Sequence, residues 1–267
     1  MITDVFLYGA IYACIGVFAG LMAGVFGVGG GIIVVPGLVF IFQLTQLIPE
    51  QIVMQVAAST SLAVMIFTSL ASVGAHFKLD KILWPVFNKL WPGIIVGVLV
   101  GAGIAEFIPS HWLKIIFALF LFFVAFKMLA DRRVVHSGQF PKTWVTQLVS
   151  FFIGLKSGLL GVGGGILIVP YLTYCGVAVR KIAAVSNLCT LTVGLIGTVV
   201  FMIIGRNETA GIPYTTGYVY WPAVLWVAIP SSLIAPLGAK LNYFLPVKQL
   251  KYVFIVILLL TAIKMLF

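Results

Sequence analysis

Apolar positions fill most of the chain in stretches close to the roughly 20 residues that a helix needs to cross a bilayer. Short polar or glycine-rich segments separate them. The first half predicts helices over residues 5–25, 32–47, 52–76, 84–106 and 111–130. The second half predicts helices over residues 144–160, 166–178, 182–204, 218–240 and 249–266. Two segments, 32–47 and 166–178, are short for a full crossing. We therefore expect an all-α polytopic membrane protein with about 8–10 membrane segments.

The chain contains an internal duplication. Residues 20–36 read GLMAGVFGVGGGIIVVP and residues 154–170 read GLKSGLLGVGGGILIVP, so 11 of 17 aligned positions are identical at an offset of 134 residues. Further downstream, Trp84-Pro85 matches Trp221-Pro222 at an offset of 137. The duplication predicts a first repeat at residues 1–131, a basic linker at 132–143 and a second repeat at 144–267, within a single transmembrane domain. In each repeat we expect a glycine-broken first hairpin followed by three spanning helices.

The lysines and arginines indicate how the repeats face the membrane, because cytoplasmic loops carry an excess of positive charge. With the linker in the cytoplasm, twelve of these residues fall on that side, three (Lys114, Arg206 and Lys264) fall outside, and Lys156 lies within the membrane. The cytoplasmic set is Lys78, Lys81, Lys89, Lys127, Arg132, Arg133, Lys142, Arg180, Lys181, Lys240, Lys248 and Lys251. We therefore predict two inverted repeats in the inner or plasma membrane, with both termini outside.

Composition supports the bilayer as the solvent of this protein. Hydrophobic residues make up 62% of the chain and charged residues 8%, against about 25% charged residues in soluble domains. The net charge of +10 would also suit a nucleic-acid partner, but the positive-inside bias accounts for it, so we expect none. The three cysteines have no paired metal spacing and are read as small core residues. We expect no metal and no cofactor.

The two glycine runs are the principal candidate for a binding site. Gly29, Gly30 and Gly31 in the first repeat correspond to Gly163, Gly164 and Gly165 in the second. A helix that begins after such a break presents free N–H groups and a positive dipole end, which together favour an anion. Close helix packing through small residues is the competing interpretation. Neither run is followed by Lys-Ser or Lys-Thr, so a Walker A nucleotide loop is disfavoured.

Lys156 is the most informative single residue, because the first repeat has Met22 at the equivalent position. A lysine so deep in a membrane helix usually marks a functional site, although its long side chain could also reach toward the interface. Polar residues that could supplement it are Ser157, Ser59, Thr60, Ser61, Ser186, Asn187 and Thr190. Interhelical hydrogen bonding is the alternative role for each of them. Our predicted substrate-binding set is Gly29–Gly31, Gly163–Gly165, Lys156, Ser157, Thr60, Ser61, Ser186 and Asn187.

The paired glycine motifs, each near the start of a repeat, resemble the sulfite exporter TauE/SafE family of membrane permeases. The segments Ser59-Thr60-Ser61-Leu62 and Gly74-x-His76…Lys78-Leu79-Asp80 are also similar to that family. The resemblance covers nearly the whole chain. It implies export of a sulfur-containing anion such as sulfite or a sulfonate, with the two GGG runs at the site.

We accordingly predict a secondary transporter that exports a small sulfur-containing anion by alternating access. An anion or small-solute channel and a proton-coupled anion uptake carrier are the alternatives. An intramembrane enzyme ranks last, because the chain offers no cluster of His, Asp and Glu. The expected partners are the small anion and the lipid bilayer, and a homodimer is an arrangement left open.

Overall fold

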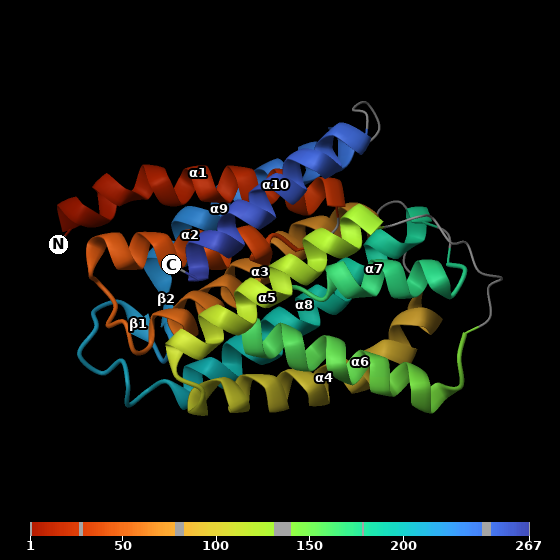
Figure 1. The fold of residues 1–267 in the computed structure, drawn as a ribbon, viewed down its shortest axis with the longest axis horizontal. Helices are drawn as coiled ribbons and strands as arrows, with labels where there is room; N and C mark the ends of the chain where they lie inside the picture. The colour runs from red at the N-terminus through yellow and green to blue at the C-terminus, as the bar shows by residue number, and fades with distance from the viewer. Residues whose placement is uncertain are drawn as a thin grey trace.

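The computed structural model describes residues 2–26, 29–77, 83–130, 140–177, 179–241 and 247–266 (Figure 1). The first half of the chain forms α1 (Ile2–Phe26), α2 (Gly31–Thr45), α3 (Val53–Phe77), α4 (Trp84–Phe107) and α5 (Ser110–Ala130). The second half forms α6 (Thr143–Leu160), α7 (Gly165–Tyr174), α8 (Val179–Ile204), α9 (Trp221–Leu241) and α10 (Val247–Leu266). Each predicted helix is present, in the predicted order.

One element departs from the helical pattern. The sequence predicted a helix from residue 218, whereas α9 begins at Trp221 and is preceded by an antiparallel hairpin of β1 (Thr215–Thr216) and β2 (Val219–Tyr220). Gly217 has a φ of +56° in the turn, a conformation that glycine adopts freely. The β-branched and aromatic residues around it favour strand pairing over helix.

Six of the described helices are long and apolar enough to cross a membrane. Their spanning parts are Val53–Gly74, Trp84–Phe107, Ser110–Ala130, Thr143–Leu160, Lys181–Ile204 and Trp221–Gly238. Shorter apolar helices cover Tyr8–Gly24, Gly31–Thr45, Gly165–Tyr174 and Tyr252–Leu266. The protein is therefore a multi-pass helical membrane protein, and the helices that follow the glycine breaks, α2 and α7, are short as expected.

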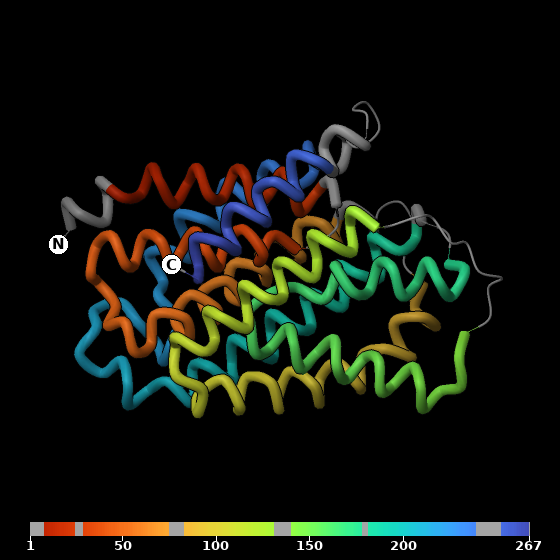
Figure 2. Tube along the Cα trace, in the orientation of Figure 1, coloured from red at the N-terminus to blue at the C-terminus, as the bar shows by residue number. Residues whose placement is uncertain are grey.

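The two halves of the chain interlock rather than forming separate bundles. The most extensive contacts pair α4 with α6 and α1 with α9, so the first helix of each repeat packs on the fourth helix of the other. Two further pairs, α3 with α8 and α5 with α10, join equivalent helices. Figure 2 shows this as red α1 lying along blue α9, and yellow α4 lying along green α6. A single core is thus built from both repeats.

Glycines at equivalent positions of the two repeats make close contacts in these pairs. A Cβ placed on Gly154 would lie 2.3 Å from the carbonyl oxygen of Ile94, and one placed on Gly20 would lie 2.4 Å from that of Ser231. The offsets of 134 and 137 residues relate these two pairs to each other. The repeated sequence therefore makes the same backbone contact twice, once in each interface between repeats.

Pairings along these helices also fix their relative directions. On α4, Gly97 approaches Phe151 of α6 and Gly101 approaches Leu155, so α4 and α6 run the same way. Between the equivalent helices α3 and α8 the order is reversed: residue 197 approaches Leu62, whereas residue 194, one turn earlier in α8, approaches both Leu62 and Ile66. The helices α3 and α8 therefore cross in opposite directions. Figure 1 shows the same opposed course for α5 and α10.

Candidate functional site

The two glycine breaks meet in the interior of the protein. A Cβ on Gly29 would lie 3.6 Å from the Cα atom of Gly163, and one on Gly31 would lie 2.8 Å from the carbonyl oxygen of Gly161. The described residues of both breaks are buried. Residues 27 and 28 of the first motif lie outside the described residues. The sequence could predict that the breaks are equivalent, and folding brings them into contact.

Glycine is required at these positions by backbone geometry. Gly29, Gly30 and Gly161 have φ angles of +80°, +74° and +67°, in the left-handed region that other residues rarely adopt. A Cβ on Gly161 would also lie 2.4 Å from the Cα atom of Ala58 on α3. The breaks are therefore fixed in shape by both the dihedral angles and the neighbouring helices.

The second break carries a run of buried backbone donors. Within the described part of the chain, the N–H groups of residues 162–166 donate no hydrogen bond, and residues 162–165 are buried while Ile166 is half-buried. The next two N–H groups, of Leu167 and Ile168, donate to the carbonyl of Gly164 and start α7. Buried N–H groups without acceptors are unfavourable by about 1–3 kcal/mol each. Such a run is therefore suited to a ligand that accepts hydrogen bonds.

The first break ends in the same way. The N–H groups of Ile33 and Val34 donate to the carbonyl of Gly30, whereas those of Gly31 and Ile32 donate to no acceptor among the described residues. Neither α2 nor α7 has an acidic residue in its first turn. Two positive helix ends therefore lie close together with no carboxylate in either first turn to oppose an anion.

Lys156 reaches the second break from α6. Its half-buried side chain donates a hydrogen bond from Nζ to the carbonyl oxygen of Gly163 at 3.3 Å. The same Nζ lies 4.8 Å from the centroid of the Phe120 ring on α5, a cation–π distance. Met22 is buried at the equivalent position of the first repeat. The cation is therefore held against one break only.

Two hydroxyls of α3 bind backbone groups of the second repeat. Ser61 donates to the carbonyl oxygen of Gly161 at 2.9 Å, and Thr60 accepts the N–H of Tyr220 at 3.1 Å. Both hydroxyl residues are fully buried. Ser61 thus ties α3 to the second break, whereas Thr60 ties it to the β1–β2 hairpin.

The other predicted polar residues are distributed differently. Ser157 is buried and donates to the carbonyl of Ile153 in its own helix, at 2.7 Å. Ser186 and Asn187 are buried on α8. Asn187 occupies the position equivalent to Ser61, at an offset of 126 residues. Their direct contact with a substrate remains a prediction.

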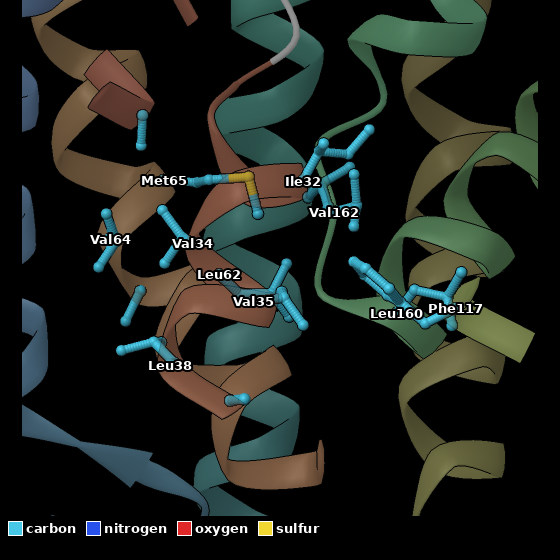
Figure 3. Packing of buried hydrophobic residues seen from close by; sticks show 14 of the residues in the cluster. Ile32, Val34, Val35, Leu38, Leu62, Val64, Met65, Phe117, Leu160 and Val162 are labelled. Carbon is cyan, nitrogen blue, oxygen red and sulfur yellow. The ribbon is translucent and has the colours of Figure 1, made fainter. Parts of the chain in front are cut away.

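Thr190 lies closer to the break than several residues in the predicted set. Its Cγ2 atom would be 2.8 Å from a Cβ on Gly29, and its fully buried hydroxyl has no hydrogen-bond partner among the described residues. Met65 approaches from α3, with its sulfur 3.1 Å from a Cβ on Gly31. Figure 3 shows Met65 extending toward the start of α2, in the same region as Ile32 and Val162. The sequence offered Thr190 as one polar candidate among several, whereas nothing in it distinguishes Met65 from the apolar positions around it.

The described residues contain no group of three or more His, Cys, Asp or Glu that could hold a metal ion. The chemistry that converges on the breaks is instead a set of N–H donors, one lysine and buried hydroxyls. These groups bind anions and do not supply an acid–base pair.

The chain is similar to known membrane proteins over nearly its whole length. The family model described as "Sulfite exporter TauE/SafE" matches residues 12–265. A "Probable membrane transporter protein" of Haemophilus influenzae is 32% identical over 94% of this chain and 95% of its own. A protein of the same description from Methanocaldococcus jannaschii is 32% identical over 89% of this chain and 87% of its own. YunE of Bacillus subtilis, also described as a probable membrane transporter protein, is 25% identical over 96% and 97%. No solved structure matches.

Proposed function

Because the chain belongs to the sulfite exporter TauE/SafE family of membrane transporters, we propose that it exports a small sulfur-containing anion, sulfite or a short sulfonate, by alternating access. The site is the contact between the two glycine breaks. Gly29, Gly30 and Gly31 line it from the first repeat, and Gly163, Gly164 and Gly165 from the second. The same membership sets the protein among transporters rather than enzymes.

The single observation that carries this proposal is the run of N–H groups at residues 162–166, four of them in buried residues, that have no acceptor in the described part of the chain. Sulfite and sulfonate oxygens are hydrogen-bond acceptors, so an anion in this position satisfies donors that no described group of the protein satisfies. The facing helix start at Gly31 and Ile32 contributes further donors. Because these donors are neutral dipoles, they can release the anion more readily than a cluster of fixed charges would.

Lys156 supplies the one full positive charge at this site. It already binds the Gly163 carbonyl, so its charge lies at the break that offers the most N–H donors. The second repeat therefore provides most of the attraction for the anion. Ser61 maintains the shape of the break through its hydrogen bond to Gly161. The buried polar residues around the site are Ser157, Thr60, Ser186 and Asn187.

The two repeats, residues 1–131 and 144–267, are in this proposal inverted about an axis in the membrane plane, with the linker 132–143 in the cytoplasm. The opposed directions of α3 and α8 support inversion. In Figure 1 both termini lie toward the end of the bundle that carries the β1–β2 hairpin, away from the last turn of α5 and the first turn of α6. Both termini are accordingly proposed to be outside the inner or plasma membrane.

Single cysteines at Ser137 and Asn207, in a variant without native cysteines, test this topology with a membrane-impermeant thiol reagent on intact cells. Labelling at position 207 and protection at position 137 is expected. Equal labelling of both would contradict the inverted arrangement. Residue 137 lies outside the described residues, whereas Asn207 is exposed beyond the end of α8.

Export by itself requires no coupled cation. A monovalent anion that leaves a cell gains about 2.3 kcal/mol for each 100 mV of negative-inside potential. This favours the export direction over a proton-coupled uptake carrier. A site built from two helix ends that contact each other also favours a carrier over an open channel.

The experiment that tests the function is flux of sulfite and of methanesulfonate in proteoliposomes, with an imposed membrane potential. We expect saturable flux that responds to the potential and shows counterflow. Lys156→Met gives the second repeat the methionine that the first repeat carries as Met22. This substitution should raise KM about tenfold or more, because hydrogen bonds to charged groups contribute about 1.5–3 kcal/mol.

Lys264→Met is the matched control. Lys264 also lies over a phenylalanine, with Nζ 3.3 Å from the Phe40 ring centroid, but it is exposed and lies in the last turn of α10. Its substitution should leave KM unchanged. An unchanged KM in Lys156→Met would remove Lys156 from the site. Non-saturating flux without counterflow would indicate a channel, and no flux of either anion would refute the proposed substrate class.

A further inference from the structure

Thr190 differs from the other helical threonines whose hydrogen bonds are known. Thr192, Thr173 and Thr261 each donate to the carbonyl four residues earlier, at 3.1, 2.8 and 2.7 Å. This is the usual way in which a helix satisfies a threonine hydroxyl. Thr190 forms no such bond, and its hydroxyl has no partner among the described residues although the side chain is fully buried.

The side chain also borders the glycine breaks, with its methyl group toward Gly29. Its Cγ2 atom would lie 2.8 Å from a Cβ on Gly29, and Gly29 itself would approach the Cα atom of Gly163 to 3.6 Å. Thr190, with its unpaired hydroxyl, therefore lies at the edge of the contact between the two breaks. A buried hydroxyl that forms no bond to its own helix, beside a run of N–H groups without acceptors, is free to donate to a bound ligand.

The repeat offers an internal comparison. At an offset of 126 residues, Thr190 corresponds to Val64, which is buried on α3. Valine and threonine have nearly the same shape and differ by the hydroxyl. The second repeat thus carries Thr190 where the first has valine, just as it carries Lys156 where the first has Met22. Both polar replacements lie next to a glycine break.

We infer that Thr190 is a specificity-determining residue whose hydroxyl donates a hydrogen bond to an oxygen of the bound anion. The ligand class is an oxyanion with at least two acceptor oxygens, one for the backbone donors of the break and one for Thr190. The inference rests on the proposed anion site between the breaks. With Thr190 as a second donor, the site distinguishes oxyanions from single-atom anions. Chloride has no separate oxygens with which to accept from both the backbone N–H groups and the Thr190 hydroxyl.

The test uses purified full-length protein and the shift in its thermal unfolding temperature with sulfite, methanesulfonate or chloride. Thr190→Val should weaken binding of the oxyanions about tenfold or more, because the lost bond is to a charged group. Without an anion the variant should be as stable as wild type or more stable, since an unpaired hydroxyl has been removed. Thr190→Ser keeps the hydroxyl and should retain wild-type affinity.

Thr198→Val is the matched control. Thr198 is also buried on α8 with an unpaired hydroxyl among the described residues, but it lies eight residues further along, about 12 Å. It should leave anion affinity unchanged. Wild-type affinity in Thr190→Val, or an equal loss in Thr198→Val, would overturn the inference while leaving anion transport intact. If wild type shows neither flux nor a shift with any of these anions, the proposed function fails together with the inference.

Discussion

Replacing Gly101 by alanine should force α4 and α6 apart. A Cβ at this position would lie 2.1 Å from the carbonyl oxygen of Leu155 and 2.9 Å from its carbonyl carbon. Carbon–oxygen contacts settle near 3.3 Å, so the two helices would have to separate by about 1.2 Å. The obstacle is backbone rather than a flexible side chain, and it therefore cannot rotate away.

The energetic effect follows from overpacking. Adding a methylene-sized group to a well-packed contact costs about 1–3 kcal/mol, which the better helix propensity of alanine offsets by at most about 1 kcal/mol. For a chain of this size the overpacking lowers the unfolding temperature by about 2–12 °C, and the propensity gain offsets at most about 4 °C of this. The contact joins the first repeat to the second, so transport should decline with it.

Gly103→Ala provides the matched control in the same helix. Nothing lies within 4 Å of a Cβ at Gly103, so this substitution should leave stability unchanged or raise it slightly. The difference in unfolding temperature between the two variants is measured by heating each in detergent. The readout is the fraction of protein that stays in the monodisperse chromatographic peak. Equal unfolding temperatures for Gly101→Ala and Gly103→Ala would refute the close backbone contact between α4 and α6.

Two further substitutions probe other parts of the structure. Ser61→Ala leaves the buried Gly161 carbonyl without the donor that now lies 2.9 Å away, and should lower stability by about 1–3 kcal/mol; an unfolding temperature equal to that of wild type would contradict this role. Burial, with added repulsion from Glu208 and Glu106, raises the pKa of Tyr218 to about 12 from 10.0. The folded protein then holds this proton while the unfolded chain loses it, so stability should fall between about pH 10 and pH 12. Tyr218→Phe should show a shallower decline over this range in a pH series of thermal unfolding, and an identical decline would exclude Tyr218 as its source.

The linear sequence determined the helices and the repeat of this protein. Long apolar stretches are sufficient to place membrane helices, because the bilayer requires each segment to satisfy its own backbone hydrogen bonds. The motif GVGGG, present twice, located both breaks and the short helices α2 and α7. An alignment of the two repeats also shows that Lys156 stands where the first repeat has Met22. These features depend only on local composition and spacing.

Tertiary structure alone decided how the helices pair and which polar groups face the breaks. The helices of this chain are apolar on nearly all faces, so hydrophobicity does not indicate which face meets lipid and which meets protein. The pairing depends on where glycines allow backbones to approach, as Gly20 and Gly154 do in opposite halves. That the Thr190 hydroxyl is buried without a partner likewise depends on the helices packed around it. Such choices are made by contacts between residues distant in sequence, and for that reason only the folded chain reveals them.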